Sequence, residues 1–326
     1  MRSADIDGHL NLQDGGITVS ESFLVSVPAT TANLGPGFDC LGAALTRYNR
    51  FRFTRATKEA AVNIKVIGLD CDRIPTDATN LAYIAFCEYF KYRNQPIPSV
   101  QMEIILEVPL ARGLGSSSTA IVGGILGANA LAGSPLPSTD LAQLATQLEG
   151  HPDNVVPALL GGCRLSTADE QGQGVLCEVP WHPDIVPIVA VPAFEISTAK
   201  ARQVLPQQYS RTDTVYTIGH LGLLLRALET GNGDWIRAAI GDRIHEPYRK
   251  TLIPGYDAVV EAALVAGAYG VTISGAGPTL LALGSTDYTE AIAQTMTQVW
   301  QQQGIEVVDT AVLQIDMIGA TVVLEP

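Results

Sequence analysis

Residues 112–119, with the sequence Arg-Gly-Leu-Gly-Ser-Ser-Ser-Thr, place two glycines directly before a run of hydroxyl side chains. Gly113 and Gly115 allow positive φ angles and a close approach of the backbone to a ligand. The serines supply hydroxyls and N–H groups at the start of the apolar segment that follows. If that segment is a helix, its first N–H groups lack intrahelical partners and carry the positive end of the macrodipole. This pattern predicts a loop that binds a phosphate.

Three better-known glycine motifs do not fit this loop. A Walker A loop continues into Gly-Lys-Ser or Gly-Lys-Thr, a dinucleotide-binding loop needs a third glycine, and a nucleophile elbow reads Gly-x-Ser-x-Gly. None of these patterns is present at residues 112–119. A Gly/Ser-rich connection that only turns a strand into a helix is the alternative to a phosphate site.

The elements that position the loop are predicted from the hydrophobic pattern. Apolar residues alternate from Val100 to Val108, which is typical of a half-buried strand, and Pro109 ends it because proline has no N–H to donate. From Ser117 onward the chain is apolar almost all round, which predicts a buried helix. We also expect strands at 23–27, 41–45, 51–54, 188–191, 271–274 and 279–283, a loop at 28–38, and helices at 80–92, 139–149 (capped by Ser138 or Thr139), 214–229, 234–244 and 257–266, with one more helix and two strands closing the chain.

The order of these elements favours the α+β class. Strands and helices do not alternate as regular βαβ units, which argues against a doubly wound sheet. The chain has 326 residues, of which 47% are hydrophobic and 16% charged, so a sizeable core can form. We place a boundary near residue 175, between lobes at 23–175 and 176–326, and interpret 1–22 as a flexible N-terminal extension. The apolar runs are too short for a transmembrane helix.

Charge and cysteine content bear on partners and location. The net charge is −13 and there is no basic stripe, so nucleic acid would be repelled. The five cysteines are odd in number and show no C-x-x-C spacing, which indicates reduced thiols in a cytoplasmic protein rather than disulfides or a zinc site. We therefore expect neither nucleic acid nor a membrane as a partner; a small-molecule substrate is implied only by the resemblance described next.

Three glycine-rich segments are spread along the chain: the first at 28–39, the second at 113–119 and the third at 274–279. In this order they resemble the three sequence boxes of the GHMP small-molecule kinases, and the resemblance covers nearly all of the chain after residue 22. Finer motifs resemble the members of that family that phosphorylate homoserine. These motifs are Glu-Gly-His-Pro-Asp-Asn at 149–154, Ser-Thr-Ala-Lys-Ala-Arg at 197–202 and Glu-Pro-Tyr-Arg at 246–249.

The resemblance implies a fold, a reaction and cofactors. The fold would have two lobes, a ribosomal S5 domain 2-like N-terminal lobe that binds ATP and a ferredoxin-like C-terminal lobe that contributes to the substrate site. The reaction would transfer phosphate from ATP, with Mg²⁺, to the side-chain hydroxyl of L-homoserine, giving O-phospho-L-homoserine for threonine biosynthesis. A homodimer is the expected assembly.

The same resemblance implies roles for individual residues. Ser117 (or Ser116) and Glu149 would bind Mg²⁺ and act in catalysis. The nucleotide would contact Asn80, Pro109, Leu110, Ala111, Arg112, Gly113, Leu114, Gly115, Ser116, Ser117, Ser118 and Thr119. Homoserine would be bound at its amino group by Asn33 and Asp39, at its carboxylate by Arg202 and Arg249, and along its pocket by His151 and Thr198. Two separate charge types in one pocket suit a zwitterionic amino acid.

The identity of a catalytic base stays open. Asp153 is one candidate, but an aspartate at a helix entrance is also a plain capping residue, which we favour. The resemblance implies that the γ-phosphate accepts the hydroxyl proton instead. Two rival functions remain: a GHMP kinase for another alcohol, such as mevalonate or a diphosphocytidyl polyol, and a non-catalytic ligand sensor on the same fold.

Overall fold

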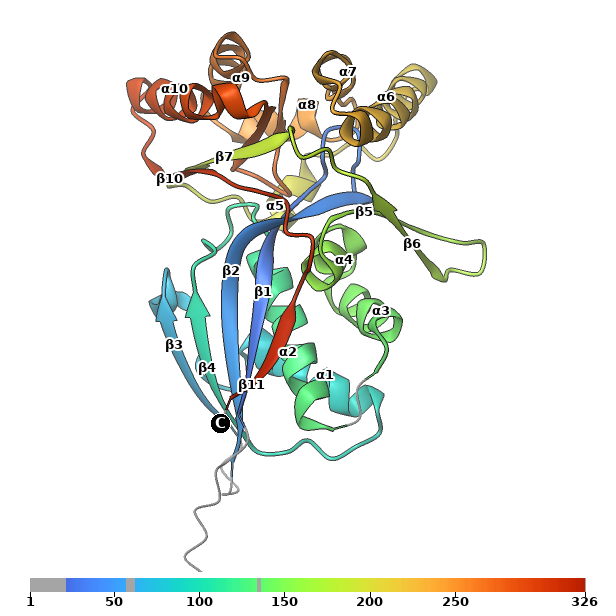
Figure 1. The fold of residues 1–326 in the computed structure, drawn as a ribbon, viewed down its shortest axis with the longest axis vertical. Helices are drawn as coiled ribbons and strands as arrows, with labels where there is room; N and C mark the ends of the chain where they lie inside the picture. Colours follow the sequence, from blue (N-terminus) through green and yellow to red (C-terminus); the bar gives the residue numbers. More distant parts are fainter. Residues whose placement is uncertain (1–21, 57–61, 134–135, 326) are drawn as a thin grey trace, which may run out of the picture.

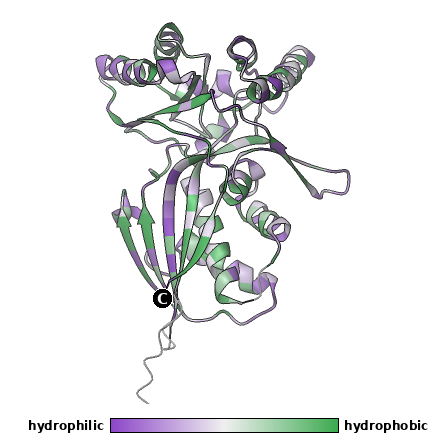
Figure 2. Ribbon diagram, in the orientation of Figure 1, coloured by the Kyte–Doolittle hydropathy of each residue, from purple (hydrophilic) through white to green (hydrophobic). Residues whose placement is uncertain are grey.

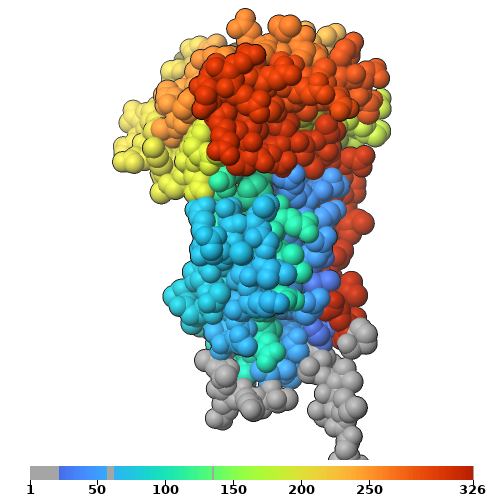
Figure 3. All heavy atoms as spheres, turned by 90° about the vertical axis from the view of Figure 1, so that its left-hand side faces the viewer, coloured from blue at the N-terminus to red at the C-terminus, as the bar shows by residue number. Residues whose placement is uncertain are grey.

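The computed structural model describes residues 22–56, 62–133 and 136–325, which build two lobes stacked end to end (Figure 1). The space-filling view shows the second lobe seated across one end of the first (Figure 3). The expected extension 1–22 lies outside the described residues except for Ser22, which begins the first strand. None of the helices in the part of the chain that the structure describes has the length and apolar character needed to cross a bilayer.

A seven-stranded sheet forms the first lobe. Its main order is β11-β1-β2-β4-β3, and β5 continues from one end of β2 and pairs with β6. The strands are β1 (Ser22–Ala32), β2 (Leu41–Arg55), β3 (Asn63–Gly68), β4 (Val100–Leu106), β5 (Cys163–Ala168), β6 (Gly174–Val179) and β11 (Thr321–Glu325). The helices that pack on it are α1 (Leu81–Tyr92), α2 (Ser116–Leu131), α3 (Ser138–Glu149) and α4 (Pro152–Leu160).

The buried helix α2 lies against β2 at unusually close range. Its glycines make this possible: a Cβ atom added at Gly123 would reach 2.5 Å from the Phe51 ring, and one at Gly127 would overlap the Phe53 ring. Both phenylalanines alternate along β2 with exposed or half-buried polar residues, which is the period of a sheet with one covered face. The helix that carries the predicted loop is therefore fixed tightly on the sheet.

The second lobe has the ferredoxin-like arrangement that the sequence predicts. Its four strands pair antiparallel in the order β10-β7-β9-β8, and the chain runs β7, helices, β8, β9, helix, β10. The strands are β7 (Val186–Pro192), β8 (Gly270–Ile273), β9 (Leu280–Gly284) and β10 (Val307–Val312). The helices are α5 (Thr198–Gln203), α6 (Arg211–Thr230), α7 (Gly233–Ala239), α8 (Glu246–Arg249), α9 (Tyr256–Val265) and α10 (Thr289–Gln302), with short 3-10 turns η1 (Cys71–Arg73, in the first lobe), η2 (Lys250–Leu252) and η3 (Thr286–Tyr288). In Figure 2, β7 is apolar along its length, whereas the outer helices α6 and α10 alternate polar and apolar residues.

Several expected elements differ from the observed ones. The predicted loop at 28–38 is wrong in its first part, because β1 continues to Ala32 and resumes pairing with β2 after a bulge at Pro28/Ala29. The two strands expected at 41–45 and 51–54 are one long strand. Helix α3 begins at Ser138 without a side-chain cap from Ser138 or Thr139, since Pro137 occupies the N-cap position. Strand β3 and helix α4 were not expected from the sequence.

The last strand of the chain returns to the first lobe. Segment 313–320 runs from β10 along the lobe junction, where Asp316 accepts a hydrogen bond from Tyr48 Oη at 2.6 Å. β11 then pairs antiparallel with β1. The expected boundary near residue 175 falls inside β6, so the division into 23–175 and 176–326 stays a prediction.

Candidate active site

The three glycine-rich segments meet at the junction of the two lobes. Gly275 N–H in the third segment donates to Ala32 O in the first at 2.9 Å. Ser274 Oγ donates to Gly113 O in the second at 2.6 Å. The third segment therefore packs directly against the other two.

Positive φ angles and close packing fix the second segment. Gly113 has φ +81° and Gly115 has φ +68°, a region that favours glycine. A Cβ atom at Gly113 would overlap Ser274 O, and one at Gly115 would overlap Thr30 Oγ1. Thr30 Oγ1 in turn donates to Asn154 Oδ1 at 2.7 Å. The loop glycines are therefore required by both conformation and space.

Gly115 is also the residue from which α2 starts. It is the N-cap of that helix, and the first intrahelical hydrogen bond runs from Thr119 N–H to Gly115 O at 2.9 Å. The N–H groups of Ser116, Ser117 and Ser118 precede this bond and have no intrahelical acceptor. All three serines line a cavity of about 460 Å³. The predicted anion site thus has the expected geometry.

Both lobes contribute to this cavity, and its two ends differ in character. The end beside α1 and β4 is mainly apolar and is lined by Asn49, Phe51, Ile74, Pro75, Asn80, Leu81, Ile104, Leu106 and Leu110. The other end is polar and is lined by Asn33, His151, Thr198, Arg202 and Arg249. The second glycine-rich segment lines the same cavity.

Asn80 combines a structural role with its place in the lining. Its Oδ1 accepts from Ala82 N–H at 3.0 Å and Tyr83 N–H at 3.3 Å, and so caps α1. Its Nδ2 donates to Pro75 O at 2.7 Å. The start of α1 therefore fixes the position of Asn80 at the apolar end of the cavity.

Glu149 and the serines come together as the sequence predicts. Glu149 Oε1 accepts from Ser117 Oγ at 3.0 Å and from Ser118 Oγ at 2.9 Å. A carboxylate and hydroxyls are the hard oxygen donors that suit Mg²⁺, which takes few protein ligands and completes its shell with phosphate and water. Within the described ranges there is no group of three or more His, Cys, Asp or Glu residues that could hold a metal without such help. The donor set fits a magnesium ion shared with a nucleotide.

Asp153 is buried behind His151. Asp153 is 1% exposed, and its Oδ1 lies 2.5 Å from His151 Nδ1. This hydrogen bond raises the pKa of His151, which lines the cavity. The capping interpretation of Asp153 is wrong. His151, not Asp153, occupies the N-cap position of α4, and no side chain makes a capping hydrogen bond there. Asp153 Oδ2 is buried with no hydrogen-bond partner.

Asp39 was expected at the ammonium group of the acceptor and Arg202 at its carboxylate. In the structure the two side chains form an ion pair with each other. Arg202 Nη1 donates to Asp39 Oδ2 at 2.9 Å and Nη2 to Oδ1 at 2.8 Å. The pair joins the two lobes. Asp39 has φ +57°, and its N–H donates to Asn33 Oδ1 at 2.8 Å. Asn33 Nδ2 donates to Gly275 O at 2.9 Å, so this end is also tied to the third segment.

Arg249 is almost fully buried, with 1% of its surface exposed. Its Nη1 donates to Gly275 O at 3.0 Å and its Nε to Ala201 O at 3.3 Å. Burial lowers its pKa from the usual arginine value. Among the described residues, no carboxylate forms an ion pair with Arg249 and its Nη2 has no hydrogen-bond partner, although the side chain lines the cavity. Thr198, the first residue of α5, lines the same end.

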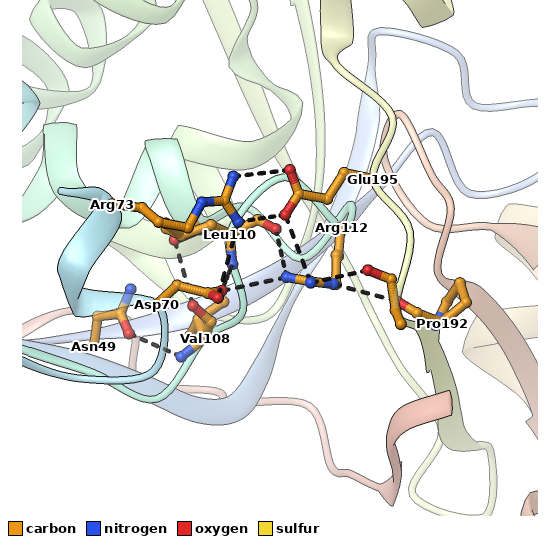
Figure 4. A network of polar contacts seen from close by, with 10 residues as sticks. Asn49, Asp70, Arg73, Val108, Leu110, Arg112, Pro192 and Glu195 are labelled. Carbon is orange, nitrogen blue, oxygen red and sulfur yellow. Dashed lines mark hydrogen bonds and ion pairs between the residues drawn. The ribbon is translucent and has the colours of Figure 1, made fainter. Parts of the chain in front are cut away.

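The guanidinium group of Arg112 donates hydrogen bonds to other groups of the same chain (Figure 4). Its Nε donates to Pro192 O at 3.2 Å and its Nη2 to Ala193 O at 3.0 Å, both in the second lobe. Its Nη1 donates to Asp70 Oδ2 at 3.2 Å and Leu110 O at 3.0 Å. The expected contact of Arg112 with a phosphate stays a prediction, and it would have to compete with these bonds.

Comparisons with known proteins agree with this geometry. Residues 80–162 match the GHMP kinases N terminal domain, and residues 224–302 match the GHMP kinases C terminal domain. A homoserine kinase of Synechococcus sp. is 59% identical over 283 residues, covering 87% of this chain and 92% of the relative. The chain belongs to the homoserine kinase family of GHMP kinases.

Other relatives extend this result. A homoserine kinase of Trichormus variabilis is 55% identical and covers 94% of this chain and 100% of its own length. The crystal structure of homoserine kinase from Cytophaga hutchinsonii has a TM-score of 0.85 at 32% identity, covering 94% of this chain and 98% of that one. The L. major mevalonate kinase in complex with R-mevalonate has a TM-score of 0.70 at 15% identity, covering 89% of this chain and 94% of that one, which shows the shared fold alone.

The structure adds residues that the sequence reasoning did not single out. Thr30 fills the space beside Gly115. Asn154 lines the cavity and accepts the hydrogen bond that the Thr30 hydroxyl donates. Phe38 lies within 6 Å of two arginine side chains, with ring-centroid distances of 5.7 Å to Arg202 Cζ and 5.0 Å to Arg249 Cζ. Thr30, Phe38 and Asn154 all lie within motifs quoted for the resemblance, which is the signal that could have found them.

Proposed function

We propose that this chain transfers the γ-phosphoryl group of ATP to the side-chain hydroxyl of L-homoserine, giving O-phospho-L-homoserine in threonine biosynthesis. One observation carries the proposal: a single cavity joins a phosphate-type helix N-terminus to a cluster with both signs of charge. Asp39 and Arg202 supply those charges beside the cavity, and Arg249 adds a second guanidinium. An amino acid needs both signs, whereas a simple alcohol does not.

The triphosphate would be bound mainly by main-chain groups. The free N–H groups of Ser116, Ser117 and Ser118 lie at the positive end of the α2 macrodipole, where an anion is stabilised. Ser117 and Glu149 would hold Mg²⁺, which when bound neutralises phosphate charge. The apolar end of the cavity, beside Asn80, would take the nucleotide base.

The acceptor would bind by exchanging partners with the ion pair at the polar end. Its ammonium group would take Asp39 and Asn33, and its carboxylate would take Arg202 and the free Nη2 of Arg249. The bidentate Arg202–Asp39 geometry supports a site in which both side chains are held at the polar end of the cavity. Side chains held there would lower the entropic cost of placing the hydroxyl in line with the phosphate.

We propose that no side chain of this chain removes the hydroxyl proton. Asp153 is bonded to His151 rather than open to the cavity, which supports a role in orienting and charging His151. As the new P–O bond forms and the bond to ADP breaks, the hydroxyl proton would pass to an oxygen of the transferred phosphate. Loss of turnover in Asp153→Asn, with ATP and homoserine binding intact, would contradict this assignment.

The experiment that tests the function is an ADP-release assay with a panel of alcohols. We expect L-homoserine to stimulate ADP release strongly and mevalonate to have little effect. A preference for mevalonate or a diphosphocytidyl polyol would favour another GHMP activity. A nucleotide turnover that no alcohol stimulates would favour a non-catalytic sensor.

We also propose a homodimer in a reducing, cytoplasmic environment. All five cysteines are free in the structure, which supports a reducing compartment. Light scattering of the purified protein tests the dimer, and fractionation of cells that express the chain tests the location.

A further inference from the structure

Phe38 lies at the point where the expected acceptor-binding residues converge. It precedes Asp39 in the first glycine-rich segment and is half-buried. Arg249 Cζ lies over its ring at 5.0 Å from the centroid, and Arg202 Cζ at 5.7 Å. The His245 ring stacks on it at 5.3 Å with an interplanar angle of 22°. Both arginines are thus within the range of a cation–π contact with one ring.

Hydrogen bonds from both lobes fix the loop that carries this ring. Gly35 N–H donates to Thr272 Oγ1 at 3.0 Å, and His245 Nε2 lies 2.9 Å from Gly35 O. Within the loop, Asp39 N–H donates to Asn33 Oδ1. These bonds therefore fix the position of the ring.

The histidine behind the ring is held as a neutral group. His245 is fully buried, and this burial lowers its pKa to about 4. At neutral pH its Nε2 carries the proton that Gly35 O accepts. His245 adds no positive charge beside Phe38, so the two guanidinium groups are the cations in contact with the ring.

The two guanidinium groups carry the same charge, so an electron-rich group beside them is needed to offset their repulsion before the carboxylate of the substrate binds. Asp39 neutralises Arg202, but among the described residues Arg249 has no carboxylate partner, only the carbonyl groups of Ala201 and Gly275. Burial and the neighbouring charge of Arg202 lower the pKa of Arg249, whereas the nearby carboxylate of Asp39 raises it without forming an ion pair. The negative face of an aromatic ring is attractive to both guanidinium groups at once.

We propose that Phe38 is a positioning residue, whose ring holds the guanidinium groups of Arg202 and Arg249 together for the carboxylate of the acceptor. The inference deepens the proposed function and rests on it. It assigns to this ring a role in affinity for the carboxylate group, separate from nucleotide binding and from the chemical step.

The first test is Phe38→Leu, which keeps an apolar side chain and removes the ring. We expect the KM for homoserine to rise about tenfold, which corresponds to a lost cation–π contribution of about 1.4 kcal/mol. The KM for ATP should stay within about twofold. Phe38→Tyr keeps the ring face and should restore most of the affinity. Phe23→Leu is the matched control, because Phe23 is also half-buried but lies at the far end of β1.

Two inhibitors separate a carboxylate effect from general damage to the pocket. L-2-Aminobutyrate has the ammonium and carboxylate groups of homoserine but no hydroxyl, whereas 3-aminopropan-1-ol has no carboxylate. In Phe38→Leu the inhibition constant of L-2-aminobutyrate should rise about tenfold, and that of 3-aminopropan-1-ol should not change. Equal increases for both inhibitors would overturn the proposal.

A second variant series covers the case in which Phe38→Leu does not fold. Phenylalanine analogues with one, two and three ring fluorines at position 38 keep the shape of the side chain while weakening the negative ring face. The KM for homoserine should rise stepwise with fluorine number, and a flat series would overturn the proposal. A wild-type protein that shows no homoserine-dependent ADP release would instead defeat the proposed function, and this inference with it.

Discussion

On the proposed function, the two ends of the cavity would bind their ligands by different means. At the nucleotide end the binding groups would be main-chain N–H groups, on a helix and a loop whose glycines pack against Thr30 and Ser274. At the acceptor end they would be charged side chains from both lobes, two of which, Asp39 and Arg202, pair with each other. The first end depends on backbone shape, and the second depends on the relative placement of the two lobes.

This difference predicts which substitutions each end of the cavity should tolerate. A backbone site should fail when a Cβ atom is added in the wrong place, because Gly113 and Gly115 leave no space for one beside Ser274 and Thr30. A side-chain site loses affinity in proportion to the contacts removed, because each charged group contributes one or two hydrogen bonds. The predictions below test this contrast.

The largest effect is expected for Gly115→Ala. The added Cβ atom would overlap Thr30 Oγ1 at a residue with φ +68°, so the loop and the start of α2 must shift. A displacement of about 1 Å at a reacting group costs roughly 100-fold in rate, and we expect kcat/KM for ATP to fall by at least that much.

The control for this change is Gly133→Ala. Gly133 also has a positive φ, at +58°, but a Cβ atom there meets nothing within 4 Å. Its activity should stay near that of the wild type. The double variant Gly115→Ala/Thr30→Ala removes the overlapping hydroxyl and should recover part of the lost activity. If Gly115→Ala and Gly133→Ala had equal activities, the nucleotide end would not depend on the shape of the backbone at Gly115, and the contrast with the acceptor end would be lost.

The sequence was sufficient for the strand, loop and helix of the nucleotide end because the information that specifies these elements is local. Gly113, Gly115 and the serines are consecutive, and the alternating strand before them and the apolar helix after them are short-range patterns. The ferredoxin-like order of the second lobe was reached through resemblance rather than periodicity. The structure agrees with both.

The remaining features depend on long-range contacts that a local pattern does not contain. β1 continues past Pro28 because β2 offers a partner beyond the bulge, and β11 pairs with β1 although nearly the whole chain separates them in sequence. Helix α4 is short and contains Pro157, and no helix was expected at its residues. The Asp39–Arg202 pair joins residues 163 positions apart.

A second prediction concerns Glu149, which stands between the two ends. Glu149→Gln keeps the shape and removes the charge that would hold Mg²⁺ with Ser117. We expect kcat to fall by roughly 30- to 100-fold, because preorganised charge at a transferring phosphoryl group is worth a few kcal/mol. The Mg²⁺ concentration required for half-maximal rate should rise.

The control for this prediction is Gln147→Ala, on the exposed side of α3. It should leave both kcat and the Mg²⁺ requirement unchanged. A Glu149→Gln enzyme whose Mg²⁺ dependence matches the wild type would contradict the metal role and leave Glu149 as a partner of the serine hydroxyls only.

Arg202→Ala tests the acceptor end directly. The loss of charge-assisted hydrogen bonds, each worth about 1.5–3 kcal/mol, should raise the KM for homoserine about tenfold or more. The KM for ATP should change little, in contrast to Gly115→Ala. Steady-state kinetics with each substrate varied in turn measures both values. Unchanged KM values for homoserine in Arg202→Ala and in Arg249→Ala would remove both arginines from the carboxylate site.

The smallest effect is expected from the titration of His151. The hydrogen bond to Asp153 raises the pKa of His151, so its positive charge persists closer to neutral pH than in a free histidine. As pH falls through the raised pKa of His151, the ring gains a proton, and the added charge should lower the KM for a carboxylate-bearing acceptor by about twofold to threefold. His151→Asn should flatten this dependence. Asp153→Asn, which removes the carboxylate that raises the pKa, should move it to lower pH. If His151→Asn keeps the wild-type pH profile, another titrating group sets that profile, and the charge of His151 has no part in the affinity for the acceptor.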